Sequence, residues 1–177
     1  MSMQQQPTLK SLTWDLHKKA ETTPLMKLLL KNEISDCLYC DLVYTKYLIY
    51  GAIENVIQFR TADLARKNAA FADWQTMGCS LPKCLPALET MLAHLRTLSE
   101  QQLWAHVYVH YLANVYGGQI IARVIGDRFP TSMYQFADPE AAKQEIRSHL
   151  TVDMAPEANR SFEMTINYYN QLYESHQ

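Results

Sequence analysis

The stretch Tyr108-Val109-His110-Tyr111-Leu112-Ala113-Asn114-Val115-Tyr116-Gly117-Gly118-Gln119 lies within a predicted amphipathic helix from Trp104 to Ile125. Two adjacent glycines are unfavourable there, because glycine inside a helix costs about 1 kcal/mol relative to alanine. Polar-tipped and aromatic side chains crowd the turns before Gly117 and Gly118. We therefore expect a kinked helix, either because bare backbone approaches a flat ligand or because another helix packs closely against it.

Composition around this stretch favours a single all-α domain. The chain has 177 residues, 48% of them hydrophobic, which is enough for one compact core. It contains only five glycines, long segments with helical periodicity and no alternating strand pattern. We expect residues 1–7 to be a disordered N-terminal segment and residues 8–177 to form the domain.

Charge and targeting signals exclude two partner classes. The formal net charge of −2 provides no basic face for nucleic acid. The glutamine-rich N-terminus lacks a signal-peptide pattern, and no stretch has the roughly 18 apolar residues that a membrane span needs. The expectation is a cytoplasmic protein without a membrane partner.

Four cysteines occur, at positions 37, 40, 79 and 84. Cys37 and Cys40 lie within a predicted helix, and Cys79 and Cys84 complete a zinc-ligand set only loosely. Free thiols in a reducing compartment are therefore favoured over a zinc site.

Caps and apolar periodicity predict the remaining helices. Thr8 caps a first helix whose apolar stripe runs from Leu9 through Leu12 to Leu29, and Ser99 with Gln102 resembles a capping box for the central helix. The other predicted helices are 35–59, 61–74, one carrying Leu85 to Leu95, one that begins after the Asp138-Pro139 cap, and one that begins at Ala155-Pro156.

Two further places carry candidate chemistry. His17 lies beside the first apolar stripe, with Glu21 one turn later, where its carboxylate can fix the imidazole tautomer. Lys143 and Arg147 are four residues apart and project from one helix face, either to hold a dianionic ligand or as a solvated charged face.

Together these segments resemble the heme oxygenase family. His17-Lys18-Lys19-Ala20-Glu21 is similar to the family's His-x-x-Ala-Glu, and the stretch quoted first is similar to its distal helix, Tyr-x-x-Tyr-Leu-Gly-Asp-Leu-Ser-Gly-Gly-Gln. Lys143-Gln144-Glu145-Ile146-Arg147 resembles the segment that holds the heme propionates. The order and spacing agree over nearly the whole chain, from about Leu9 to Tyr173.

The resemblance implies a heme oxygenase-like helical bundle, with heme as cofactor and substrate between a proximal N-terminal helix and the kinked distal helix. The reaction is oxidative cleavage of heme to biliverdin, ferrous iron and carbon monoxide. It uses dioxygen and electrons from an external donor, a ferredoxin or a flavoprotein reductase. The implied metal ligand is His17, bound to the heme iron. Asn114, Gly117 and Gly118 take the catalytic positions. The implied heme-contacting residues are Lys10, His17, Tyr108, Ala113, Lys143, Arg147 and Phe162, with Tyr169 beside Phe162 in the apolar wall.

The distal segment departs from the family pattern. Asn114 replaces the usual aspartate that anchors the proton-delivering water network, and Ala113 replaces a glycine. An amide orients water but carries no titratable proton. His110 and Tyr116 replace an arginine and a serine, and either side chain is a possible proton source.

Three functions stay open at this point. The first is a heme oxygenase, and the second is a catalytically weak or inactive heme-binding protein of the same fold, for storage, transport or sensing. The third keeps the fold without heme, as in helical thiamin-salvage enzymes.

Overall fold

The computed structural model describes residues 6–177, and every regular element within them is helical. The all-α prediction is thereby confirmed, whereas the predicted disorder of residues 1–7 falls largely on residues 1–5, outside the described part. The α-helices are α1 Leu9–Glu21, α2 Pro24–Leu30, α3 Asp36–Glu54, α4 Lys67–Met77, α5 Pro86–Leu95, α6 Glu100–Val107, α7 Ala113–Tyr116, α8 Gly118–Ile125, α9 Pro139–His149 and α10 Ala155–Glu174. A π-helix spans Tyr108–Leu112, and short 3₁₀ helices span Ser132–Tyr134 and Val152–Met154.

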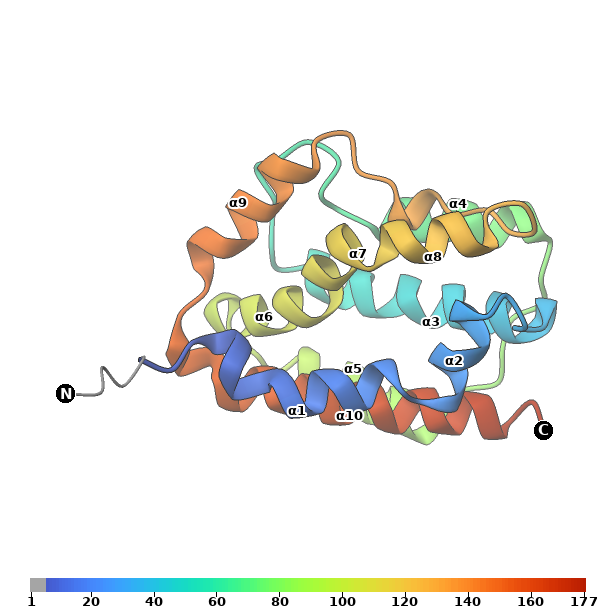
Figure 1. Ribbon diagram of the computed structural model, residues 1–177, viewed down its shortest axis with the longest axis horizontal. Helices are drawn as coiled ribbons and strands as arrows, with labels where there is room; N and C mark the ends of the chain where they lie inside the picture. Colours follow the sequence, from blue (N-terminus) through green and yellow to red (C-terminus); the bar gives the residue numbers. More distant parts are fainter. Residues whose placement is uncertain (1–5) are drawn as a thin grey trace.

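The helices form two sides. On one side α1 lies along α10, with α5 against α10 (Figure 1). On the other side α3 packs on α4, and α7 and α8 continue from α6. The first and last helices of the chain therefore face the central stretch of the sequence.

Local caps begin the helices where the sequence predicts them. The Thr8 and Ser99 side chains each accept a hydrogen bond from the backbone N–H three residues later, and both form capping boxes. Asp138 caps α9 in the same way, with proline at the first helical position. These three predictions are confirmed.

Three helix boundaries were predicted wrongly. The first helix ends at Glu21 and a second begins at Pro24, because Pro24 has no N–H and its fixed φ favours a first helical turn. Leu12 was also placed wrongly. It lies on the exposed side of α1, 43% accessible, and not in the apolar stripe.

The third helix begins at Lys67 instead of residue 61. The Glu145 carboxylate accepts hydrogen bonds from the backbone N–H groups of Arg60 and Thr61, at 2.7 and 2.6 Å. Asp63 has a positive φ of 66°, which a right-handed helix does not permit. Long-range contacts thus hold this segment as a loop. The helix predicted for 35–59 likewise ends earlier, at Glu54.

The cysteines also differ from prediction. Cys40 of α3 and Cys79, just after α4, form a disulfide with a Cα–Cα distance of 6.2 Å, so they are not free thiols. Cys37 and Cys84 are free and exposed. The pairing needs the side-by-side packing of α3 and α4, which sequence spacing does not reveal.

The buried carboxylate of Asp73 fixes the position of an aromatic residue in the interior, Tyr134. Asp73 of α4 accepts hydrogen bonds from the backbone N–H groups of Ser132 and Met133, at 3.0 and 2.9 Å. This fixes the 3₁₀ helix that carries the buried Tyr134. Among residues 6–177, no helix combines the length and apolar character needed to cross a membrane.

Candidate functional site

The central helix is interrupted twice. After α6 the chain widens into the π-helix of Tyr108–Leu112, and at Gly117 it breaks again between α7 and α8. Single π-turns inside α-helices occur frequently at functional sites. The predicted interruption at the glycines is confirmed, whereas the π-helix has no counterpart in the prediction.

These interruptions border a cavity of about 120 Å³ that is partly open to solvent. The lining is mostly apolar, with a few convergent polar groups. It comprises His17, Ala20, Glu21, Met26, Leu29, Leu42, Lys46, Val109, His110, Ala113, Asn114, Gly117, Ile121, Tyr134, Phe162, Thr165 and Tyr169.

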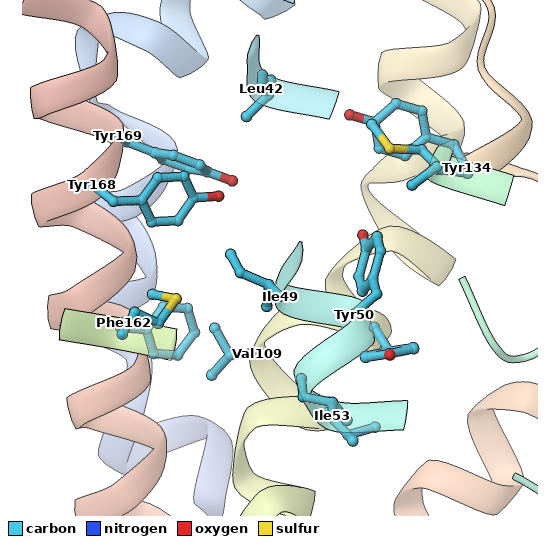
Figure 2. Packing of buried hydrophobic residues seen from close by; sticks show 14 of the residues in the cluster. Leu42, Ile49, Tyr50, Ile53, Val109, Tyr134, Phe162, Tyr168 and Tyr169 are labelled. Atoms are coloured by element: carbon cyan, nitrogen blue, oxygen red, sulfur yellow. The ribbon is translucent and has the colours of Figure 1, made fainter. Parts of the chain in front are cut away.

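Aromatic rings enter this region from opposite sides (Figure 2). Tyr169 and Phe162 project from α10, whereas Tyr50 of α3 and Tyr134 lie across from them. Burial raises the pKa of Tyr50 and of Tyr134 above the ordinary value, so both phenols are neutral at pH 7.

His17 lies at the α1 side of the cavity. Its ring stacks on Trp14, with centroids 5.4 Å apart, and meets the edge of Phe162 at 5.7 Å. One ring nitrogen, Nε2, lies 3.5 Å from the Glu21 carboxylate, as the one-turn spacing predicts. The other, Nδ1, is buried and has no hydrogen-bond partner among residues 6–177. The imidazole is thus placed between Trp14, Phe162 and Glu21, with one ring nitrogen that makes no hydrogen bond there.

The two glycines occupy different environments. Gly117 lines the cavity, and a Cβ atom there would closely approach only the Ala113 carbonyl oxygen, at 3.2 Å. Gly118 is outside the lining, and its Cβ would lie 2.8 Å from Cδ1 of the Tyr134 ring. Close packing therefore accounts for Gly118, whereas approach of a ligand to the bare backbone of Gly117 stays a prediction.

Asn114 and His110 supply polar groups beside Gly117. Asn114 is buried and donates a hydrogen bond from Nδ2 to the Tyr50 hydroxyl. His110 is also buried, with Nε2 3.4 Å from the Ser161 hydroxyl. Burial, and then the positive charge of Lys46, lowers the pKa of His110 well below its ordinary value, so the imidazole is neutral. Tyr116, the other departure from the family pattern considered as a proton source, is exposed and outside the lining.

A buried carboxylate–histidine cluster lies behind the π-helix. The Glu157 carboxylate of α10 accepts hydrogen bonds from Nε2 of His94 and of His106, at 2.5 and 2.8 Å. The hydrogen bond from His106 lowers the pKa of Glu157 to about 2. This cluster ties α5 and α6 to α10 and so supports the wall of the cavity.

Four predicted heme-contacting residues lie outside the cavity lining. The Lys10 ammonium lies over the Trp14 ring, 5.6 Å from its centroid, and the Tyr108 hydroxyl lies 3.1 Å from that of Thr13.

The other two, Lys143 and Arg147, meet at Tyr116 as their four-residue spacing permits. The Lys143 ammonium lies 4.5 Å from the centroid of the Tyr116 ring and 2.7 Å from the Glu140 carboxylate. Arg147 donates a hydrogen bond to the Tyr116 hydroxyl. By contrast, His17, Ala113, Asn114, Gly117 and Phe162 all line the cavity.

Sequence reasoning missed Lys46, Tyr50 and Tyr134 as site residues. Leu42, Lys46 and Tyr50 follow one another at intervals of four residues and share one face of α3. The available signal was a single lysine in the middle of a long, largely apolar helix. Tyr134 gave no such signal, because its place depends on the contact with Asp73.

Comparison with known proteins gives a consistent result. A family model described as heme oxygenase matches residues 3–167. Heme oxygenase 1 of Nostoc sp. is 27% identical over an alignment of 191 positions. This alignment covers 88% of this chain and 80% of that protein. The crystal structure of heme oxygenase-1 from the cyanobacterium Synechocystis in complex with heme has a TM-score of 0.81 at 24% identity, covering 94% of this chain and 91% of that one. The heme oxygenase from Leptospira interrogans has a TM-score of 0.76 at 22% identity, with coverages of 92% and 97%. At these identities the two solved structures establish a shared fold.

Proposed function

This chain belongs to the heme oxygenase family, and from that premise we propose that it cleaves heme oxidatively to biliverdin, ferrous iron and carbon monoxide. Dioxygen is the co-substrate, and the electrons come from a separate donor, a ferredoxin or a flavoprotein reductase. Heme is both cofactor and substrate. When bound, it supplies the iron at which dioxygen is activated.

The residues of the cavity fit heme. The observation that carries the proposal is the buried, unpaired Nδ1 of His17 at one side of the cavity, with the bare backbone of Gly117 also in the lining. Heme iron in proteins commonly takes one proximal histidine ligand. Glu21 beside the other ring nitrogen fixes the imidazole orientation, as carboxylates do for metal-bound histidines.

The groups near Gly117 serve the distal side. We assign Asn114 and the Tyr50 hydroxyl, joined by a hydrogen bond, to the orientation of water beside the reacting ligand. His110 is buried in the lining and its pKa lies well below the ordinary value, so it is a poor proton acceptor and we assign its neutral imidazole to hydrogen bonding with distal water. Phe162, with Tyr169, covers the apolar faces of the porphyrin, and Ala113 allows close approach next to Asn114.

Lys10, Tyr108, Lys143 and Arg147 are assigned to the solvent-facing propionate groups. None lines the cavity. In this assignment Lys143 and Arg147 exchange their contacts with Glu140 and Tyr116 for a carboxylate. Each such charge-assisted hydrogen bond contributes about 1.5–3 kcal/mol at most, and less where solvent reaches it.

A second candidate function is heme binding without efficient turnover. The observation that favours it is Asn114, whose buried amide cannot carry the titratable proton of the usual aspartate. Storage, transport or sensing of heme would need the same cavity.

Product formation separates the two candidates. Ferric heme is titrated into the protein and followed by its visible absorbance, and the complex then receives dioxygen with ascorbate or a ferredoxin–reductase pair. An oxygenase loses the heme band and develops bilin absorbance. A heme-binding protein retains heme under every competent electron donor. Absence of heme binding would contradict both.

A further inference from the structure

Three side chains of the kind that bind metal ions meet outside the cavity lining. His94 of α5, His106 of α6 and Glu157 of α10 each offer one ligand atom, and these atoms lie within 4.8 Å of one another. Both histidines direct Nε2 at the same carboxylate oxygen, at 2.5 and 2.8 Å. Glu157 is 63 and 51 residues from the two histidines in the sequence. The packing of three helices, and no local motif, therefore brings the three ligand atoms together.

The cluster can be reached from one side. The His106 side chain is fully buried, whereas those of His94 and Glu157 are 18% and 20% exposed. An ion therefore has an entry path past His94 and Glu157, with His106 at its inner side. Nδ1 of His106 has no hydrogen-bond partner among residues 6–177. A proton moved there from Nε2 breaks only the hydrogen bond to Glu157, and it frees Nε2 to bind a metal.

The distances are compatible with a small metal ion. Zinc binds imidazole nitrogen and carboxylate oxygen at about 2.0–2.2 Å, so neighbouring ligand atoms of a tetrahedral site are about 3.4 Å apart. The two Nε2 atoms now lie 2.5 and 2.8 Å from the Glu157 oxygen. The partly exposed carboxylate therefore needs to withdraw by less than about 1 Å to admit the ion.

The ligand types indicate the class of ion. Two imidazoles and one carboxylate suit zinc, ferrous iron and their neighbours in the first transition row, whereas magnesium and calcium prefer oxygen ligands alone. Three protein ligands leave at least one coordination position for water. A divalent ion also offsets the negative charge of Glu157, which now has only hydrogen bonds from the two histidines.

We propose that His94, His106 and Glu157 bind one divalent first-row transition-metal ion through the two Nε2 atoms and the carboxylate. The ion replaces two hydrogen bonds by three coordinate bonds and so joins α5 and α6 to α10 more firmly. The site stands apart from the proposed function, because none of its residues lines the cavity. Ferrous iron, a product of that function, belongs to the same class of ion.

The test uses metal ions alone and the full chain after treatment with a chelator. Cobalt is the probe, because Co²⁺ accepts the same ligands as zinc and its visible absorbance reports the coordination geometry. We expect one Co²⁺ per chain, displaced by Zn²⁺ and by an excess of Fe²⁺ without dioxygen, and not by Mg²⁺. Bound Zn²⁺ should also raise the melting temperature.

Two variants locate the ion. In Glu157→Gln the side-chain oxygen still accepts hydrogen bonds from both imidazoles, but the carboxylate charge is lost. His94→Ala removes the partly exposed imidazole. Loss of outer-shell partners alone weakens metal binding about 10- to 100-fold, so loss of a ligand should weaken it by at least about 100-fold. His176→Ala should bind as wild type does. It is a matched control, because His176 is 19% exposed and its Nε2 lies 2.8 Å from the Asp41 carboxylate.

Three results would overturn the proposal. The first is a wild-type protein with no saturable cobalt binding, and the second is wild-type affinity in either Glu157→Gln or His94→Ala. The third is a sulfur-to-cobalt charge-transfer band, which would place the ion at the exposed thiols of Cys37 or Cys84. If circular dichroism shows that a variant does not fold, proton NMR of cobalt-loaded wild type decides. We expect hyperfine-shifted imidazole resonances from two histidines, and fewer than two would contradict the site.

Discussion

At the scale of single residues, the central feature of the site is a histidine whose hydrogen-bonding capacity is only partly used. His17 is stacked on Trp14, meets Phe162 and lies beside Glu21, yet its Nδ1 is buried without a partner. Such an atom is unfavourable in the unliganded protein and becomes favourable when a ligand occupies it. Binding of a ligand at Nδ1 would therefore remove an unfavourable feature of the unliganded protein.

Replacement of His17 by alanine should remove the axial ligand and little else, because the residue is half-exposed and lies at the edge of the core. We expect the variant to keep its fold and to bind heme with a changed ferric spectrum, which added imidazole restores towards that of wild type. Absorbance titration with and without imidazole checks this. His176→Ala is a matched control, since His176 pairs with Asp41 outside the cavity lining. A native spectrum in His17→Ala without imidazole would exclude the assignment.

Asn114→Asp tests the distal departure. The Tyr50 hydroxyl now accepts from the amide, but a phenol can also donate, so the hydrogen bond can be retained with a carboxylate. The restored carboxylate should increase the rate of biliverdin formation by up to about 100-fold, the lower end of general acid–base contributions, with little change in heme affinity. Single-turnover absorbance measures the rate. A slower Asn114→Asp protein would mean that proton delivery is built around the amide and His110.

At the scale of the helices, the two glycines provide a paired experiment. Gly118→Ala places a methyl group against the buried Tyr134 ring. Overpacking typically costs about 1–3 kcal/mol, which the roughly 1 kcal/mol gain in helix propensity only partly offsets. We therefore expect a net loss of up to about 2 kcal/mol in the free energy of unfolding, measured by urea denaturation.

Gly117→Ala should behave in the opposite way. Its Cβ meets only the Ala113 carbonyl, so the free energy of unfolding should change by less than about 1 kcal/mol, while the methyl group enters the cavity lining and weakens heme binding. Equal stability and equal heme affinity in the two variants would contradict the separate roles given to these glycines.

The helix boundaries also show which local features can be predicted from the sequence and which cannot. The caps at Thr8, Ser99 and Asp138 were predictable because each depends on a side chain and a backbone N–H three residues apart. The loop before α4 was not, because the hydrogen bonds that hold it come from Glu145, more than eighty residues later.

The site likewise divides into residues that the sequence predicts and residues that only the structure reveals. The motifs predicted His17, Asn114 and Gly117 as site residues, and all three line one cavity. They did not reveal Lys46, whose place in the cavity lining depends on how α3 packs, nor the Cys40–Cys79 disulfide, which depends on the packing of α3 against α4.

At the scale of the whole molecule, the cavity is lined by residues of α1 and α10 on one side and of α3, α7 and α8 on the other. Figure 1 shows these helices on opposite sides of the molecule. A ligand that contacts both sides joins segments from the beginning, middle and end of the chain. Heme binding is therefore linked to the stability of the whole fold.

We expect heme to increase the free energy of unfolding by about 2.7 kcal/mol when its free concentration is 100 times the dissociation constant. Chemical denaturation at several heme concentrations measures this, and His17→Ala at the same concentrations should gain less because its dissociation constant is larger. A free energy of unfolding that does not depend on heme would mean that heme does not bind the native cavity.

The central claim is that heme bound in this cavity is consumed as a substrate. The most direct test is a single turnover of the heme-loaded protein in a sealed vessel, with dioxygen and a competent electron donor, in which carbon monoxide, bilin and released iron are all quantified. We expect one equivalent each of carbon monoxide, bilin and iron for every heme consumed. Heme that remains intact, or that disappears without matching carbon monoxide and bilin, would contradict the claim.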